Sequence, residues 1–126
     1  MERRPGFTLI ELLIVMVIIG ILASIAIPSW LSVKRRGYDA GLRSDLRNLV
    51  VAQENYLHDH GTYSPNGTLL QSLFVPTGGN TLNIVQATPA GWSATITSVN
   101  TPTVCAIFVG TAPLAPATIE GVVGCQ

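Results

Sequence analysis

The chain has 126 residues, with 7 basic and 7 acidic side chains, and 48% of its residues are apolar. This length allows one small domain and excludes a multidomain enzyme, and the balanced charge argues against a general nucleic-acid binder. The charge is unevenly placed, because residues 48–126 contain no Lys or Arg and only the carboxylates of Glu54, Asp59 and Glu120. That part of the chain cannot by itself hold a polyanion.

An apolar segment covers residues 7–33, after a short basic start that includes Arg3 and Arg4. Its charge-free part, residues 12–33, reaches about 33 Å as a helix, against a bilayer hydrocarbon core of about 30 Å. We therefore expect a helix that spans a membrane. A removable secretory signal peptide is the alternative, but the length of the segment and Pro28 at the cleavage position count against it.

Glu11 is the one charged residue inside this apolar segment. An ionised carboxylate within a membrane helix is costly, so it needs either a partner or a shallow position. Two interpretations are open at this point. Glu11 lies near the interface and pairs loosely with Arg3 or Arg4, or it neutralises a positive charge that another chain brings.

Gly20 and Pro28 weaken the same helix at two places. Pro28 has no N–H, so the carbonyl of Ser24 loses its helical partner, and a glycine lowers helix propensity by about 1 kcal/mol. A kink within the membrane helix is the simple interpretation.

Residues 34–60 are expected to form an amphipathic helix of a globular head, continuing the first helix. An apolar stripe recurs at intervals of three, four or seven residues, which predicts a face that packs against the rest of the head. The stripe consists of Leu31, Tyr38, Leu42, Leu46, Leu49, Gln53 and Tyr56. Much of the remaining surface carries the basic residues Lys34, Arg35, Arg36, Arg43 and Arg47, together with Asp39 and Asp45.

This basic cluster has three interpretations. It is a collar that faces solvent or lipid headgroups, or it forms ion pairs with Asp39, Asp45 or acidic groups of other chains. The third interpretation, capture of nucleic acid through its phosphates, is the least favoured, because the stripe would have to stay exposed.

His58, Asp59 and His60 are three potential metal ligands in a row. Consecutive residues of a helix point in different directions, and Gly61 marks the helix end, so we expect no metal site there. Residues 61–79 are predicted to be a connecting loop, because turn-forming residues cluster at its start.

From residue 80 onward the apolar period changes from helical to alternating. Residues 82–86, 92–97 and 104–109 predict three strands, separated by short turns that contain Pro, Gly or Asn. An antiparallel sheet laid on the helix is the simplest arrangement, so the predicted fold class is α+β. Residues 110–126 are predicted to be a loop.

Cys105 and Cys125 are the only cysteines, and their spacing suits neither a thiolate metal site nor a redox pair. A disulfide formed in an oxidising compartment is the simplest interpretation, which places this part of the chain outside the cytoplasm. Closing a loop of about 20 residues stabilises a domain by roughly 3 kcal/mol. Residues 80–126 are therefore expected to form an antiparallel sheet and a disulfide loop.

No catalytic set emerges from the sequence. Both histidines lie at one turn, so the Ser and Thr residues lack a general base, and no phosphate-binding glycine loop is present. We expect neither enzymatic activity nor a cofactor.

The sequence from Gly6 to Leu12, GFTLIEL, stands between a basic leader and an uninterrupted apolar run. It resembles the prepilin signature of type IV pilins and of the pseudopilins of type II secretion. The resemblance implies that residues 1–6 are a leader peptide, that a prepilin peptidase cuts between Gly6 and Phe7 on the cytoplasmic side, and that Phe7 is then N-methylated. It also implies an N-terminus inside the cell, although two basic residues, Arg3 and Arg4, precede the span and three, residues 34–36, follow it, which favours the opposite orientation.

The resemblance also gives Glu11 a role, which is to pair with the N-terminal amine of Phe7 in a neighbouring subunit and so set the register of assembly. Two opposite charges buried together cost far less than either alone. An intramolecular pair with the chain's own Phe7 stays open, since the two residues are about 6 Å apart along a helix axis. In similar pilins the helix unwinds between matching glycine and proline positions, which suggests that residues 21–27 extend on assembly.

A pilin-like chain is expected to be a structural subunit. It is inserted in the cytoplasmic membrane as a precursor, is trimmed, and is polymerised by pilus assembly machinery into a homo-oligomeric helical filament, an extracellular type IV pilus for adhesion, twitching motility or DNA uptake. A pseudopilin of type II secretion is the alternative, and a monomeric membrane-anchored binding module outside the cytoplasm is the second. Many major pseudopilins carry acidic calcium-binding loops, so the lack of acidic clusters after Asp59 and the cysteine pair favour a pilus.

Overall fold

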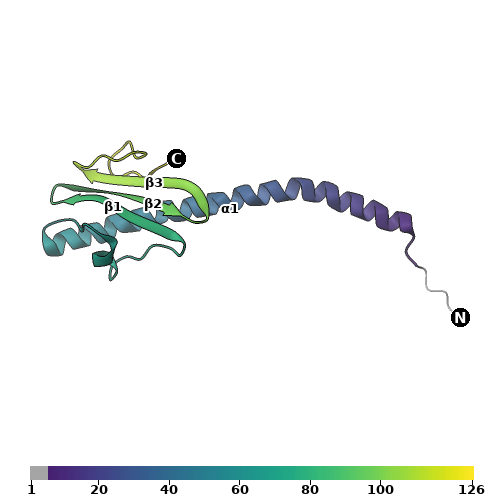
Figure 1. Cartoon of the computed structure of the whole chain (residues 1–126), viewed down its shortest axis with the longest axis horizontal. Helices are drawn as coiled ribbons and strands as arrows, with labels where there is room; N and C mark the ends of the chain where they lie inside the picture. The colour runs from purple at the N-terminus through teal and green to yellow at the C-terminus, as the bar shows by residue number, and fades with distance from the viewer. Residues whose placement is uncertain (1–5) are drawn as a thin grey trace. The chain divides into compact units, whose positions relative to one another are not determined.

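The computed structural model describes residues 6–126. Its elements, in chain order, are α1 (Leu9–His60), the short 3-10 helix η1 (Gly67–Leu70), β1 (Asn80–Thr88), β2 (Gly91–Ser98), β3 (Thr101–Gly110) and β4 (Gly124–Cys125) (Figure 1). The chain divides after Lys34 into two compact units. The second unit, Arg35–Gln126, is called the head below. The α+β prediction is confirmed, with a long N-terminal helix and a small antiparallel sheet packed on its C-terminal half.

The N-terminal part of α1 is helical through both residues that were expected to weaken it, Gly20 and Pro28. Residues 21–27 belong to the helix, and the Ser24 hydroxyl donates to the carbonyl of Ile21 at 2.7 Å. The extension expected for this segment on assembly is thus not a feature of the single chain.

The C-terminal part of α1 buries one face against the sheet. Leu42, Leu46 and Leu49 are fully buried at intervals of three or four residues, as an amphipathic helix requires. The predicted stripe is right for these leucines and for Gln53, and Tyr38 and Tyr56 at its ends are half-buried. It is wrong for Leu31, whose side chain is 61% exposed.

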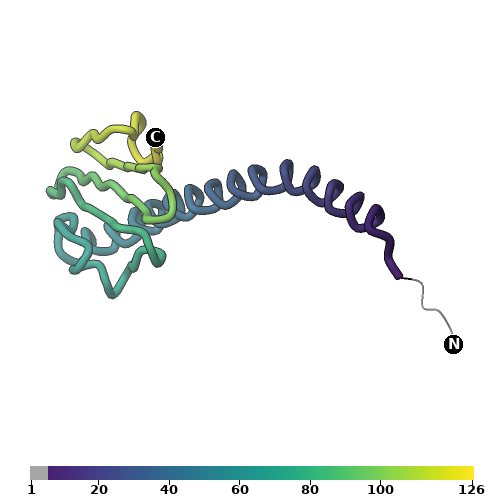
Figure 2. Tube along the Cα trace, turned by 45° about the vertical axis from the view of Figure 1, so that its right-hand side comes forward, coloured from purple at the N-terminus to yellow at the C-terminus, as the bar shows by residue number. Residues whose placement is uncertain are grey.

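The sheet has four antiparallel strands in the order β1-β2-β3-β4. Alternate residues of β2, namely Trp92, Ala94 and Ile96, are fully buried in the same cluster as the leucines of α1. Figure 2 shows the three long strands, in green, beside the blue and teal part of the helix. Alternation along the strands therefore places the apolar face on α1, as the sequence period predicted.

The prediction that residues 110–126 are only a loop is wrong at its end, because Gly124–Cys125 forms β4. Cys105 pairs with Cys125 in the ladder, and the backbones of Val104 and Gln126 exchange hydrogen bonds of 2.9 and 3.0 Å. A side chain at position 124 would collide with the backbone of Pro116 and Ala117, so the ladder requires glycine there. A strand of two residues carries no alternation that a sequence period could reveal.

The connecting loop is held to the helix by an amide in the apolar stripe. Gln53 is fully buried, its Nε2 donates to the carbonyl of Ser64 at 3.0 Å, and its Oε1 accepts from the N–H of Ser64 at 2.8 Å. The loop also contains η1, which the sequence analysis did not predict, and the side chain of Asn66 caps it by accepting from the N–H of Leu69.

Candidate functional site

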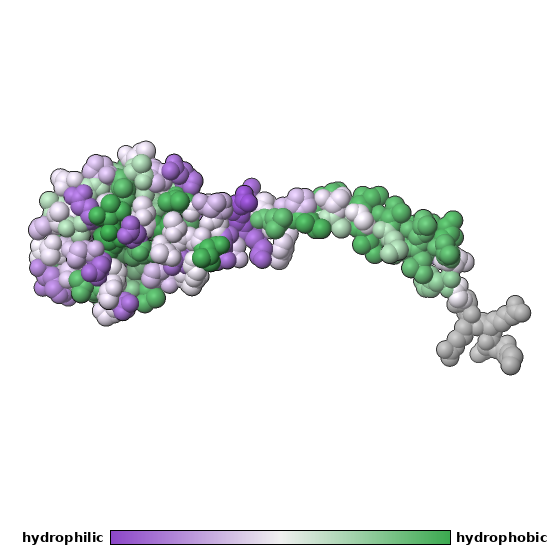
Figure 3. Space-filling model, in the orientation of Figure 1, coloured by the Kyte–Doolittle hydropathy of each residue, from purple (hydrophilic) through white to green (hydrophobic). Residues whose placement is uncertain are grey.

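The N-terminal part of α1 exposes an apolar surface of a size that soluble monomers rarely show. The helix is long and apolar enough to cross a membrane, and none of its most apolar 18-residue window is buried inside the chain. Figure 3 shows these hydrophobic side chains, in green, gathered along the segment. Such a surface must be covered by lipid or by other protein chains.

The first turn of α1 is a capping box formed by Thr8 and Glu11. The N–H and the hydroxyl of Thr8 both donate to Oε2 of Glu11 at 2.8 Å, and the N–H of Glu11 donates to the Thr8 hydroxyl at 3.3 Å. Reciprocal bonds of this kind satisfy backbone donors that have no helical partner. The helix therefore begins at Leu9, directly after Thr8.

This geometry leaves one oxygen of the Glu11 carboxylate available. Both bonds from Thr8 end on Oε2, so Oε1 accepts no hydrogen bond from the part of the chain that the structure describes. The carboxylate is thus fixed by Thr8 through one oxygen and can receive a cationic donor through the other. Sequence analysis missed Thr8, although a Thr three residues before a Glu at the start of an apolar run is the known signature of such a cap.

The predicted cleavage position lies just before this capping box. Gly6 and Phe7 are both exposed and precede the helix, and the side chain of Phe7 is 81% exposed. The peptide bond between them is therefore accessible. The rest of the predicted leader, residues 1–5, lies outside the described residues.

The basic cluster does not form the intramolecular ion pairs that were considered for it. Asp45 is 4% exposed and accepts from the N–H and hydroxyl of Thr77 and from the amide of Asn80, at 2.7 to 2.9 Å. Asp39 accepts from the hydroxyl of Thr101 at 3.0 Å. Both carboxylates thus bind the loop and the sheet. The assignment of Asp45 to the solvated face was wrong, because the head supplies three donors for its burial.

The disulfide between Cys105 and Cys125 is present, with the two Cα atoms 4.1 Å apart and a sequence separation of 20. Cys105 is fully buried in the core between sheet and helix, and Cys125 packs against that core. The bond therefore ties the C-terminal segment to a central strand of the head.

The three potential metal ligands at the end of α1 do not converge. Nδ1 of His58 lies 3.1 Å from the carboxylate of Asp59, whereas His60 stacks on the ring of Tyr56 with centroids 3.9 Å apart. Residues 6–126 contain no group of three or more His, Cys, Asp or Glu side chains that could hold a metal ion.

Tyr63, just after the helix end, is the titratable group with a perturbed environment in the head. Its hydroxyl donates to the carboxylate of Glu54 at 3.0 Å, and its ring lies 6.3 Å from that of Trp92. Burial raises the pKa of Tyr63 above its ordinary value, and the bond to Glu54 raises the pKa further. The arrangement fixes the loop to the helix.

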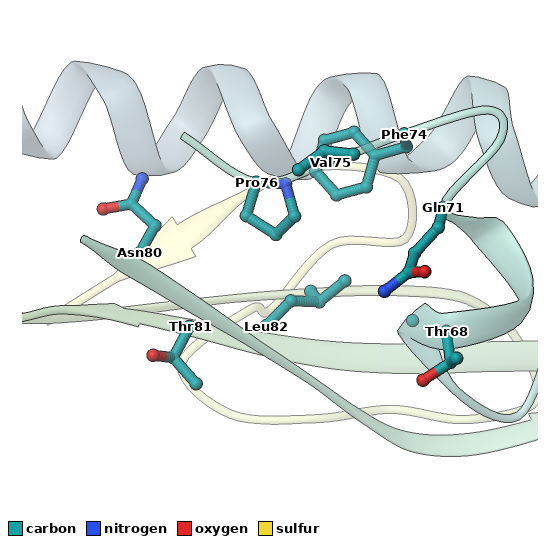
Figure 4. A pocket seen from close by; sticks show the side chains of 9 residues that line it. Thr68, Gln71, Phe74, Val75, Pro76, Asn80, Thr81 and Leu82 are labelled. Atoms are coloured by element: carbon teal, nitrogen blue, oxygen red, sulfur yellow. The ribbon is translucent and has the colours of Figure 1, made fainter. Parts of the chain in front are cut away.

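An open groove of about 590 Å³ lies between η1, the segment that follows it and the start of β1 (Figure 4). Phe74, Val75, Pro76 and Leu82 form its apolar wall, and the remaining lining residues are Gly67, Thr68, Gln71, Asn80 and Thr81. None of the lining residues is titratable, so the groove offers no acid-base chemistry.

A family profile, the prokaryotic N-terminal methylation motif, matches residues 1–27. The chain is also 36% identical over 107 residues to the type IV wide pilus major component PilA4 of Thermus thermophilus, a match that covers 85% of this chain and 74% of that protein. The chain belongs to the family of type IV pilins and type II secretion pseudopilins. The motif covers the capping box and the apolar part of α1 as far as residue 27, and the longer match extends into the head.

Two further relatives show both branches of the pilin family. The type IV major pilin protein PilA of Myxococcus xanthus is 40% identical over 78 residues, which is 62% of this chain and 34% of that protein. The type II secretion system core protein G of Klebsiella pneumoniae is 37% identical over 73 residues, which is 58% of this chain and 52% of that protein. The chain thus spans a third to a half of the length of these two relatives and about three quarters of the Thermus protein.

Proposed function

We propose that this pilin-family chain is a structural subunit that polymerises, through the apolar part of α1, into a type IV pilus. The observation that carries the proposal is a fully exposed apolar helix whose first turn presents a single fixed carboxylate. An apolar surface without such a group would serve as an anchor. An apolar surface with a buried carboxylate requires a cation at a defined place, and a neighbouring subunit with a free amine provides one.

The amine comes from processing of the precursor. The precursor lies in the cytoplasmic membrane with its N-terminus inside, a prepilin peptidase cleaves between Gly6 and Phe7, and Phe7 is N-methylated. The match to the methylation motif supports this step, as does the accessible bond before the helix. The secondary amine of Phe7 keeps its positive charge and binds Oε1 of Glu11 in an adjacent subunit, while Thr8 holds Oε2.

Gly20 and Pro28 give the filament a place to extend. The carbonyl of Ser24 cannot receive an N–H from Pro28, so the hydrogen-bond ladder between the two residues starts out weakened. Residues 21–27 would extend on assembly. The extended segments would then let the finished filament stretch under load. Filaments of the variant Gly20→Ala/Pro28→Ala should be stiffer in single-filament stretching, and unchanged stiffness would exclude this role.

A pseudopilin of type II secretion is the alternative function, because the protein G relatives of Klebsiella pneumoniae and Escherichia coli match more than half of the chain. Two observations favour the pilus. The match to the Thermus pilus component reaches 85% of the chain and so includes much of the head, and the head is closed by a disulfide. A monomeric anchored binding module is less favoured, since the groove beside η1 is lined by no charged group and a lone anchor gains nothing from Glu11.

The experiment is a deletion of the gene in the organism that encodes it, complemented by the wild-type chain, with surface filaments sheared off and examined by electron microscopy and immunoblotting. A pilus subunit predicts that filaments containing the chain disappear on deletion and return on complementation. Unchanged filaments with loss of exported enzymes would indicate the pseudopilin. Unchanged filaments and unchanged export, with the chain found only in membranes, would indicate the anchored module.

A further inference from the structure

We propose that Trp30, Lys34, Arg35 and Arg36, called the collar below, bind the headgroups of anionic phospholipids at the outer face of the membrane before the subunit enters a filament. This inference rests on the proposed function, because it requires a precursor that spans the membrane with its N-terminus inside. It adds a lipid ligand to the membrane stage of that function.

The collar stands where the hydrocarbon layer ends. Lys34, Arg35 and Arg36 follow directly on the charge-free segment 12–33, whose helical length of about 33 Å matches a hydrocarbon core of about 30 Å. Consecutive residues of a helix are about 100° apart around its axis, so the three cations spread over more than half of the circumference. All three are exposed.

Trp30 supports the same position from the apolar side. Its side chain is 64% exposed and lies one helical turn before Lys34, and therefore on the same side of the helix. Tryptophan is enriched where hydrocarbon meets headgroups, because its ring is apolar and its indole N–H is polar. At the end of a membrane span, an aromatic residue at the hydrocarbon boundary is favoured just before cations at headgroup level. Trp30, one turn before Lys34, follows this order.

No carboxylate of residues 6–126 forms an ion pair with the collar. Within residues 6–126 the one ion pair joins His58 to Asp59, and the two carboxylates nearest along the helix, Asp39 and Asp45, accept hydrogen bonds from the head. A second copy of the chain is a sparse source as well. Residues 48–126 contain only the carboxylates of Glu54, Asp59 and Glu120, and one oxygen of each already contacts Tyr63, His58 and the N–H of Gly110, respectively.

The orientation of the precursor places these unpaired cations on the side of the membrane that basic residues normally avoid. With the N-terminus inside, three consecutive cations follow the span on the outer side, whereas basic residues next to a span normally favour the inner side. Because three cations at the outer end of the span oppose insertion with the N-terminus inside, we expect a negatively charged ligand to compensate them there. Headgroup phosphates surround a membrane helix at this depth, and an anionic lipid adds the net negative charge that attracts juxtamembrane cations.

The protein contains its own reporter for a test. Trp30 and Trp92 are its two tryptophans, and Trp92 is fully buried in the head. The full chain is inserted in vesicles of phosphatidylcholine and phosphatidylglycerol, in which one lipid or the other carries bromine on its acyl chain near the headgroup. Bromine quenches indole fluorescence at contact, so the ratio of the two quenching curves gives the lipid preference next to Trp30. The variant Trp30→Phe supplies the unquenched background of Trp92.

Wild type should prefer phosphatidylglycerol by on the order of fivefold, and Arg35→Gln/Arg36→Gln should reduce the preference to about twofold or less. The matched control, Arg43→Gln/Arg47→Gln, removes two exposed arginines of the same helix outside the collar and should keep the wild-type preference. Equal quenching by both brominated lipids in the wild type, or equal losses in the two double variants, would overturn the proposal.

Two further arms separate the remaining outcomes. If inorganic phosphate abolishes the preference at constant ionic strength, the collar binds phosphate from solution and the lipid assignment is wrong. If neither lipid quenches Trp30, the helix is not inserted and the proposed function fails together with the collar. Strong quenching of Trp30 that is equal for the two brominated lipids would reject lipid binding by the collar and leave the proposed function intact.

Discussion

Glu11 has two roles that substitutions can separate, which are to cap the helix through Thr8 and to carry a charge for assembly. Glu11→Gln removes the charge and keeps a carbonyl oxygen that can accept the two bonds from Thr8. Thr8→Ala keeps the charge and removes the hydroxyl, which donates to Oε2 and accepts from the N–H of Glu11. Asp59→Asn is the matched control, since Asp59 is an exposed carboxylate at the far end of α1.

Loss of the cap and loss of the charge should differ in their effect on free energy. Loss of a capping side chain lowers helix stability by about 1 kcal/mol, or roughly fivefold in an equilibrium constant. Removal of one partner from a buried ion pair leaves the other charge unpaired in an apolar setting, which lowers an association constant on the order of a thousandfold. Glu11→Gln should therefore abolish filaments, and Thr8→Ala should reduce them by no more than about tenfold.

The assay is the ratio of chain in sheared filaments to chain in membranes, measured by quantitative immunoblot, with intact mass confirming that each variant is cleaved. Asp59→Asn should behave as wild type. If Glu11→Gln gave the same ratio of filament to membrane chain as Thr8→Ala, the carboxylate would matter only as a helix cap. That result would refute the charge pairing proposed for Glu11.

Three further predictions concern the head and are measured on the full chain in detergent. Replacing Cys105 and Cys125 together with alanine should lower the free energy of unfolding by about 3 kcal/mol in a urea titration followed by near-ultraviolet circular dichroism, and an unchanged midpoint would contradict this. Asp45→Ala leaves three donors without their acceptor and should cost about 3 kcal/mol in the same titration; a loss below about 1 kcal/mol would mean that water replaces the carboxylate. Because the folded pKa of Tyr63 is raised, its contribution is complete below the ordinary pKa of 10.0 and is lost as pH rises through the folded pKa, so wild type should lose stability above pH 10 more steeply than Tyr63→Phe. Parallel pH profiles for the two proteins would exclude this linkage.

Elements whose apolar residues repeat over several turns or along a whole strand could be predicted from sequence. The stripe of Leu42, Leu46 and Leu49 and the alternation around Trp92 and Ile96 both follow the period of their element, and both are buried as that period requires. The uncharged run before residue 34 likewise predicts a helix with an apolar surface all around it, and the structure leaves that surface exposed.

Features that depend on partners distant in sequence could not be predicted. Asp45 looks like a surface carboxylate in its helical context, and its burial depends on donors from Thr77 and Asn80, more than 30 residues away. The strand at Gly124–Cys125 likewise depends on the edge of β3 and on the disulfide. A single sequence shows the apolar period of an element, but it does not show which hydrogen-bond donors of other elements will contact it.

The capping box is an intermediate case. Its signature is local and was present at Thr8 and Glu11, but the charge of Glu11 in an apolar run drew the interpretation toward charge pairing alone. The structure shows that one oxygen serves the cap and that the other is available.

The proposed function requires that the chain be cleaved after Gly6 and assembled through the new amine of Phe7. Intact mass and N-terminal sequencing of the chain in filaments sheared from the cell surface test it most directly. The chain in filaments should start at N-methyl-Phe7, with Cys105 and Cys125 oxidised. A chain found only in membranes, with Met1 to Gly6 still attached, would contradict it.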